Sequence, residues 1–257
     1  MIEYARTKCG SRQVAEIVTD WEWDTASALP TLGLLGLKAL TVLGRTCERV
    51  RQIKGIGVPI DHLPLDDGKT YDLLRRGDTS GIFQLDSEER RDLCRKLQIS
   101  SFEHLTALVA LYRPGPMDLV PDFIKRRHGK VAVLYAHPLL ECILKETYGL
   151  LIYQEQIMQA AQVLAGFTLG SADLLRRAMG KRKFEELAQH RELFVNGCMK
   201  ANSTPATEAN QLFDWLVEFA GYGFNKSHAV AYAMVTYQTA YLKANYPVEF
   251  LSTVQAP

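Results

Sequence analysis

The amino-acid sequence predicts a mainly α protein with a few short strands. Apolar residues recur at helical spacing over most of the chain, and capping and stop residues bracket these stretches. Uninterrupted apolar runs of strand length are few by comparison. The chain has 257 residues, of which 47% are hydrophobic, which is enough to bury a core and excludes the disordered and collagen-like classes.

The predicted helices follow from their caps and apolar faces. Ser100 and Glu103 have the spacing of a capping box, and Pro114 ends the helix that they open. Apolar residues from Ile157 to Leu164 mark one face of a second helix. Thr204 and Pro205 mark the start of a third helix, which has an apolar stripe over 212–220 and a stop at Gly221. Ser227 has the character of the cap of a last long helix, which Pro247 closes.

Two runs have the length of strands. Residues 81–85 (GIFQL) and 149–153 (GLLIY) are short apolar runs bounded by glycine or by the start of a helix. They are equally consistent with the first turns of buried helices, because periodicity does not separate the two for so short a run.

Two segments resemble seams between parts of the chain. Residues 19–36 carry no sustained helical period, and residues 54–64 hold the glycines and prolines typical of a linker. We therefore expect a junction over 1–36, a connector over 37–64 and a helical domain over 65–257.

The charge balance restricts the partners. The chain has 30 Lys and Arg against 29 Asp and Glu, which excludes a uniformly basic nucleic-acid-binding surface. An anion site must therefore come from local clustering of cations. We expect no membrane partner, because no uncharged stretch is apolar enough to span a bilayer. The five cysteines lack C-x-x-C spacing and no signal peptide is visible, so we expect free thiols in a reducing cytosol.

The strongest cationic cluster lies at residues 174–183 (LLRRAMGKRK). Arg177 and Lys181 stand one helical turn apart with Arg176 beside them, and Ser171 has the character of an N-cap. Such a group suits a polyanion, since arginine grips phosphate bidentately and lysine adds a point charge. The alternative is a solvated basic helix end that Gly180 stops.

A second cluster spans residues 221–232 (GYGFNKSHAVAY). Its two glycines permit close backbone approach or a positive φ, and Lys226 and His228 follow just at the start of a helix. A helix N-terminus with free N–H donors is a geometry used for phosphate. The spacing is not that of a Walker loop. The alternative is a capped helix with His228 on its surface.

Two further segments carry weaker signals. Arg113 begins a rigid Arg-Pro-Gly-Pro turn, and Lys125, Arg126 and Arg127 form a basic helix end. A solvated last turn that complements the helix dipole is the alternative for those three. Residues 153–156 (YQEQ) could form a buried polar network or a cap, and we assign them no chemistry.

Taken together, these segments resemble the α subunits of bacterial DNA polymerase III, the C-family replicative polymerases. The resemblance covers roughly residues 34–254 and implies the multi-helix fingers domain that closes over the incoming nucleotide. It rests on six ordered motifs, at 81–85, 102–116, 147–156, 172–181, 219–228 and 237–243.

The resemblance assigns roles to the cations. Arg176 and Arg177 match the paired arginines that contact the triphosphate in this family, with Lys181 beside them, and Lys226 and His228 match the motif that faces the nascent base pair. It implies deoxynucleoside triphosphates, primer–template DNA and other parts or subunits of a replicative polymerase as partners, in the bacterial cytoplasm and associated with the nucleoid. The possible DNA contacts are Arg113, Lys125, Arg126 and Arg127.

The metal-binding carboxylates of the family are the point of departure. The family places two aspartates just before a segment similar to residues 2–10, where this sequence begins, and a third at the position of Gly33. A palm lysine aligns with Thr31. The acids of residues 20–24 (DWEWD) alternate as metal ligands could, but they stand in the wrong place for the family motif. We therefore expect Mg²⁺ for the intact family enzyme and no metal bound by this chain alone.

These features predict a fragment of a DNA-directed DNA polymerase, with residues 1–36 as a remnant of the palm. We expect it to bind nucleotide and DNA but to have little or no activity alone, so that no residue is assigned as catalytic. The alternative is a non-catalytic helical nucleic-acid-binding or regulatory module on the same scaffold. A third possibility is a helical interaction scaffold whose basic helix ends only confer solubility.

Overall fold

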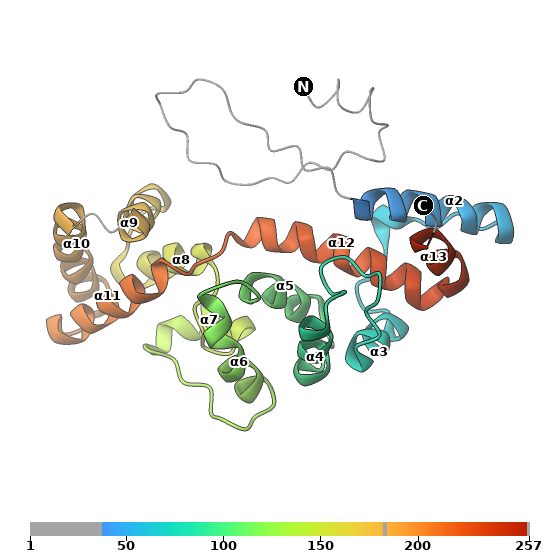
Figure 1. Cartoon of the computed structure of the whole chain (residues 1–257). Helices are drawn as coiled ribbons and strands as arrows, with labels where there is room; N and C mark the ends of the chain where they lie inside the picture. The colour runs from blue at the N-terminus through green and yellow to red at the C-terminus, as the bar shows by residue number, and fades with distance from the viewer. Residues whose placement is uncertain (1–37, 182–183, 256–257) are drawn as a thin grey trace, which may run out of the picture. The chain divides into compact units, whose positions relative to one another are not determined.

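The chain forms two compact units, each described here by itself. The computed structural model describes residues 38–181 and 184–255 (Figure 1). One unit contains the described residues up to Val109 together with those from Ser227 onward, and the other runs from Ala110 to Lys226. The stretch predicted as one helical domain, residues 65–257, thus contributes to both units, whereas the predicted limits at 36 and 64 stay predictions.

Packing of helices from both ends of the described chain builds the first unit. α13 packs against α2, with Leu43 and Phe250 buried between them, and Nζ of Lys54 lies 3.1 Å from Oε1 of Glu249. The elements of this unit are α2 (Lys38–Lys54), η1 (Ile60–His62), α3 (Gly68–Arg76), α4 (Glu88–Leu97), most of α5 (Phe102–Leu111), nearly all of α12 (Lys226–Asn245) and α13 (Pro247–Val254).

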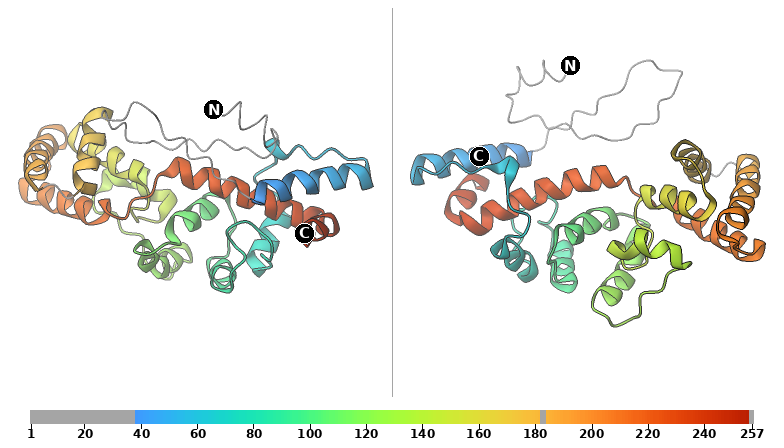
Figure 2. Two further views of the ribbon diagram at one scale, coloured as in Figure 1. Left: turned by 45° about the horizontal axis from the view of Figure 1, so that its top comes forward. Right: turned by 180° about the vertical axis from the view of Figure 1, so that it is seen from behind.

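A four-helix cluster forms the core of the second unit. α8 packs on α9 and α10, and α10 packs on α11, so the four lie together in both views of Figure 2. Their buried side chains include Leu164, Phe194 and Phe213. The elements are η2 (Pro116–Leu119), α6 (Val120–Arg127), η3 (Pro138–Leu140), α7 (Glu141–Leu144), η4 (Lys145–Thr147), α8 (Gln154–Ala165), α9 (Leu169–Lys181), α10 (Phe184–Asn202) and α11 (Ala206–Ala220).

The mainly α class is confirmed, and the two apolar runs form neither of the alternatives left open for them, strands or first turns of helices. Residues 81–85 form turns, because Gly81 and Gln84 have φ values of 75° and 59° that break an extended chain. In 149–153, extended backbone ends in one isolated parallel bridge from Tyr153 to Phe224. That bridge is the only β pairing in the described part of the chain.

The predicted helix faces are confirmed, whereas the predicted caps shift. The four apolar residues of the second helix are buried on α8, and four of the five residues of the 212–220 stripe are buried on α11, with Val217 half-buried. α5 begins at Phe102. The His104 N–H donates to the Ser101 hydroxyl at 3.5 Å and the Ser100 N–H donates to Nδ1 of His104 at 3.3 Å, so these bonds lie one residue later than the predicted Ser100–Glu103 box.

Two other caps come from unexpected residues. The Thr168 hydroxyl accepts the N–H of Ser171 at 3.2 Å, so Ser171 lies inside α9 instead of capping it. Likewise Ser227 lies inside α12, which begins at Lys226. Gly180 does not stop α9, which continues for one more residue.

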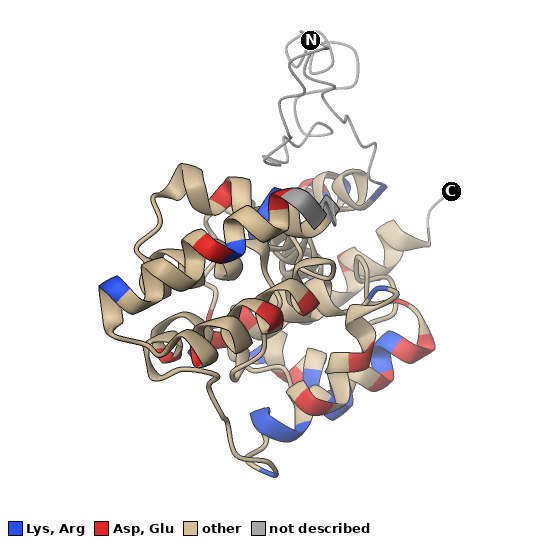
Figure 3. Cartoon of the chain, turned by 90° about the vertical axis from the view of Figure 1, so that its left-hand side faces the viewer, with Lys and Arg blue, Asp and Glu red and all other residues tan. Residues whose placement is uncertain are grey.

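Charged residues of both signs share the same helices. Figure 3 shows Lys and Arg together with Asp and Glu on several of the described helices. Within the described ranges, no helix has the length and apolar content to cross a membrane.

Candidate functional site

The Tyr153–Phe224 bridge joins two of the predicted segments. The Phe224 N–H donates to the carbonyl of Ile152, and the Gln154 N–H donates to the carbonyl of Phe224, both at 2.9 Å. Residues 221–226 are thereby fixed against the start of α8. All of these residues belong to the second unit.

Gly223 permits this close contact. A Cβ atom built on Gly223 would lie 3.2 Å from Cγ and 3.4 Å from the backbone N of Gln154, which is tighter than side chains normally pack. Of the two possibilities left open by the sequence, the structure therefore uses close backbone approach. Gly221, the C-cap of α11, has an ordinary φ of −70°.

Buried Gln156 holds the backbone segment that receives Phe224. Its Oε1 accepts from the N–H groups of Ile152 and Tyr153 at 2.9 and 3.0 Å. Its Nε2 donates to the Thr147 hydroxyl at 2.9 Å and to the carbonyl of Ile143 at 3.3 Å. The side chain is 1% exposed, so all of its hydrogen-bonding groups are satisfied inside the protein. Of the two alternatives for 153–156, Gln156 thus satisfies both: it forms a buried polar network, and its Oε1 caps α8 by accepting the N–H of Tyr153.

Arg113 clamps the other side of the 222–224 segment. Its guanidinium donates to the carbonyl of Tyr222, lies 4.6 Å from the centre of the Phe224 ring, and donates from Nε to Ala110 at 3.1 Å. Burial lowers the pKa of Arg113. Gly115, with φ of 96°, brings the turn against the Tyr222 ring, where a Cβ would lie 2.9 Å from ring carbons. The predicted contact of Arg113 with DNA stays a prediction. In the structure its guanidinium binds the 222–224 segment of the protein.

Arg176 reaches the same start of α8 from α9. Its Nη1 donates to Oε1 of Gln154 at 3.3 Å, and its Nε and Nη2 donate to Oδ1 of Asp173 at 3.1 and 2.9 Å. Its side chain is 17% exposed. Arg177 is more exposed, at 34%, and its Nε lies 2.9 Å from Oδ2 of Asp173, at ion-pair distance but without the alignment of a hydrogen bond.

Lys226 approaches from the beginning of α12. Its Nζ donates to Oε1 of Glu146 at 2.6 Å and lies 5.3 Å from the centre of the Tyr153 ring. Its backbone N–H donates to both carboxylate oxygens of Glu155 at 2.9 Å. Glu155 therefore caps α12 from a different helix and occupies a donor that the sequence suggested for phosphate.

Three consecutive residues at the start of α8 connect these cations. Gln154 contacts Arg176, whereas Tyr153 and Glu155 contact Lys226. Residues from two of the predicted clusters, far apart in sequence, thus both contact residues 153–155 in the second unit. A hollow of about 640 Å³ opens beside Lys226, lined also by Glu146, Gln159 and Gln162 among others.

The other predicted site residues lie elsewhere or outside the description. His228 belongs to the first unit, where its ring stacks on Tyr232 at 4.4 Å and burial lowers its pKa. Lys181 is the last residue of α9, and its side chain lies outside the described residues. The expectations for Gly33, Thr31 and residues 20–24 also fall outside them.

The basic end of α6 is partly engaged within the protein. Arg126 donates to Asp122 at 3.1 Å and to the carbonyl of Tyr148 at 3.2 Å, and its side chain is only 18% exposed. Lys125 is exposed and Arg127 is half-buried. Their contact with DNA stays a prediction.

The sequence interpretation missed the acidic partners. Asp173 stands three and four residues before the two arginines, the spacing at which side chains meet on a helix, and this signal was available in the sequence. Glu146 and Glu155 are distant in sequence from Lys226, so no local pattern could have paired them with it.

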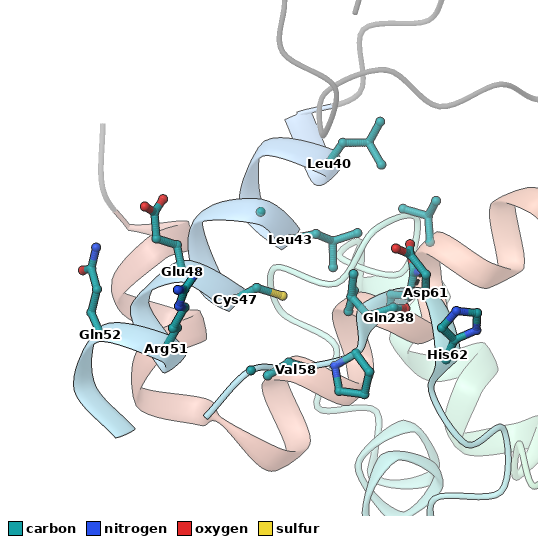
Figure 4. A pocket seen from close by; sticks show the side chains of 15 residues that line it. Leu40, Leu43, Cys47, Glu48, Arg51, Gln52, Val58, Asp61, His62 and Gln238 are labelled. Atoms are coloured by element: carbon teal, nitrogen blue, oxygen red, sulfur yellow. Dashed lines mark hydrogen bonds between the residues drawn. The ribbon is translucent and has the colours of Figure 1, made fainter. Parts of the chain in front are cut away.

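A separate hollow of about 930 Å³ lies in the first unit. Its walls come from α2, from residues 57–62 and from α12, and Leu43, Cys47 and Gln238 are among the side chains drawn in Figure 4. None of the predicted site residues lines it. Among the described residues, no three His, Cys, Asp or Glu side chains are grouped as metal ligands.

Comparison with known proteins identifies the family. Residues 39–202 match the family described as the bacterial DNA polymerase III alpha subunit finger domain. The chain is 50% identical over 231 residues to DNA polymerase III subunit alpha of Caulobacter vibrioides and 50% identical over 244 residues to that of Thermus aquaticus. These alignments cover 90% and 92% of the chain but only 20% of each relative, so the chain spans about a fifth of their length. The Pseudomonas aeruginosa subunit is 48% identical over 251 residues, 93% of this chain and 21% of that protein.

Proposed function

The chain belongs to the finger-domain family of bacterial DNA polymerase III α subunits, and from this premise we propose that it binds the triphosphate of an incoming deoxynucleotide together with primer–template DNA. In this proposal it acts as part of a replicative DNA-directed DNA polymerase, alongside the other parts and subunits of that enzyme.

The observation that carries the proposal is that Arg176 and Lys226 both contact residues at the start of α8. A nucleoside triphosphate carries about four negative charges, and its binding therefore needs several convergent cations. Arg177, one residue along α9 and partly exposed, supplies a third. Half-buried cations bind phosphate more strongly than fully solvated ones, because the surrounding protein screens their charge less than water does.

The chain's own residues would hold the phosphates by hydrogen bonds and charge. A guanidinium offers two parallel N–H donors to phosphate oxygens, and an ammonium adds a point charge. Because Gln154 orients Arg176 and the Tyr153 ring supports Lys226, both cations start close to a binding conformation.

The described carboxylates of this site do not suit a metal ion. Asp173, Glu146 and Glu155 are each engaged by a cation or by the N-terminus of α12. In this proposal none of these three carboxylates therefore serves as a ligand of the Mg²⁺ expected for the family enzyme.

A binding titration tests the phosphate site. We expect the double variant Arg176→Ala, Arg177→Ala to lose at least tenfold in affinity for a deoxynucleoside triphosphate, since a charge-assisted hydrogen bond contributes about 1.5–3 kcal/mol. Arg191→Ala is the control, because Arg191 pairs with Asp214 on the same unit and touches none of the site residues. Unchanged affinity in the double variant would refute the site.

Primer extension tests whether the chain is active alone. We propose that this chain alone incorporates no nucleotide in the presence of Mg²⁺, on the sequence interpretation that Gly33 stands at the position of a family aspartate. Robust templated synthesis would overturn that interpretation of Gly33.

A further inference from the structure

Each described cation of the candidate site already holds a carboxylate. Asp173 binds Arg176 and Arg177 together, and Glu146 binds Lys226. A polyphosphate that binds these cations must therefore replace internal anions as well as water. The cost of that replacement helps to set the affinity.

Asp173 mimics a phosphate most closely. Its two oxygens divide between the arginines: Oδ1 accepts two hydrogen bonds from Arg176, and Oδ2 lies 2.9 Å from Nε of Arg177. Two guanidinium groups thus converge on one small anion with two oxygens on a common atom. Arginine also binds phosphate oxygens through its N–H donors and its charge.

The two arginines differ in how firmly they are held. Arg176 has a second partner in Gln154 and is 17% exposed, so it keeps its place when the carboxylate leaves. Arg177 is 34% exposed and is bound to Asp173 by charge alone. Arg177 is therefore the cation that exchanges first.

The exchange displaces a carboxylate that solvent partly reaches. Asp173 is 31% exposed, and ion pairs reached by solvent contribute only about 0.2–1 kcal/mol each. An entering triphosphate offers more charge and more acceptor oxygens than the single carboxylate. It can displace Asp173, whereas a weaker anion such as chloride cannot form the same set of hydrogen bonds.

We propose that Asp173 is an internal substitute for phosphate: it holds Arg176 and Arg177 together in the empty site, is displaced when polyphosphate binds, and thereby limits the affinity. The inference rests on the proposed triphosphate site and adds a residue that determines its strength. Asp173 is a positioning residue, since it acts through the two arginines.

The test is the affinity of the 257-residue chain for a deoxynucleoside triphosphate after Asp173→Asn. The amide keeps the shape and removes the charge, so we expect binding to become about three- to tenfold tighter, the equivalent of losing two partly exposed ion pairs. Asp173→Glu restores a carboxylate and is expected to stay within twofold of the natural chain.

Asp92 provides a matched control. It pairs with Arg95 and Lys96 at the same spacing along a helix, at 3.2 and 3.0 Å, but belongs to the first unit. Asp92→Asn makes the same change in net charge and is expected to leave triphosphate affinity within twofold. Equal tightening in Asp92→Asn and Asp173→Asn would reduce the effect to net charge and overturn the proposal.

The outcomes also separate this inference from the function on which it rests. If the Arg176→Ala, Arg177→Ala variant binds triphosphate as well as the natural chain, the phosphate site itself fails. If that variant loses binding but Asp173→Asn binds no tighter or binds more weakly, the site stands and Asp173 merely orients the arginines. Thermal unfolding of each variant identifies any that does not fold.

Discussion

We expect the substitution Gln156→Leu to destabilise the backbone that supports the candidate site. Leucine fills a similar volume but removes the acceptor shared by the N–H groups of Ile152 and Tyr153. Both donors lie in a buried segment, and an unsatisfied buried donor costs about 1–3 kcal/mol. The carbonyl of Ile143 and the Thr147 hydroxyl lose a partner too, although the Thr147 hydroxyl keeps its bond to the carbonyl of Leu150 at 2.6 Å.

The expected loss from Gln156→Leu is therefore about 3 kcal/mol in the free energy of unfolding. For a chain of this size, that corresponds to a fall in melting temperature of about 6–12 °C. The control is Gln159→Leu, an exposed residue one turn along α8, which is expected to change stability by less than about 0.5 kcal/mol.

Amide hydrogen exchange measures the local effect directly. In Gln156→Leu, the amides of Ile152 and Tyr153 should exchange faster, and that of Phe224 should follow because it donates to the carbonyl of Ile152. Triphosphate affinity should fall as well, since Gln154 and Tyr153 support Arg176 and Lys226. A destabilisation below about 1 kcal/mol with unchanged exchange at Ile152 would refute the reasoning.

Two further outcomes are expected from the surroundings. Gly223→Ala should destabilise the chain by about 1 kcal/mol in urea unfolding, because the new Cβ would lie 3.2 Å from Gln154. The control Gly221→Ala places its Cβ within 4 Å of no atom and should be neutral. Equal effects of the two substitutions would contradict the close approach at Gly223. Burial lowers the pKa of His228, so the midpoint of its NMR titration should lie below 6.5. Its contribution to stability should be complete above pH 6.5 and be lost as the pH falls through the lowered pKa. A midpoint above 6.5 would exclude this.

Helix faces could be predicted from sequence, because they depend on period alone. The apolar stripes of α8 and α11 are buried as their spacing indicates, since one helix face must cover the core. Helix starts were predicted less well. A cap needs only one acceptor within reach, and for α12 that acceptor is Glu155, which lies 71 residues away in sequence.

The failure of the apolar run 149–153 to form a strand has a related cause. The run 149–153 is apolar and ends in extended backbone at Tyr153, but its neighbour supplies only Phe224 before α12 begins. A strand needs a partner of similar length, and no property of the run itself reveals whether the fold provides one. The sequence could therefore predict the conformation of this segment but not its pairing.

The sequence predicted clusters of cations, whereas in the structure each described cation of the candidate site is paired with an acidic residue. The predicted cluster begins at Leu174, one position after Asp173, and Asp173 pairs with both arginines. The near equality of 30 basic and 29 acidic residues thus reflects local pairing as well as a global sum. A neutral pair in a half-buried place keeps cations ready at little cost, because neither charge is left uncompensated before a ligand arrives. A surface can therefore serve a polyanion without appearing strongly basic, provided that its internal anions are held weakly enough to leave.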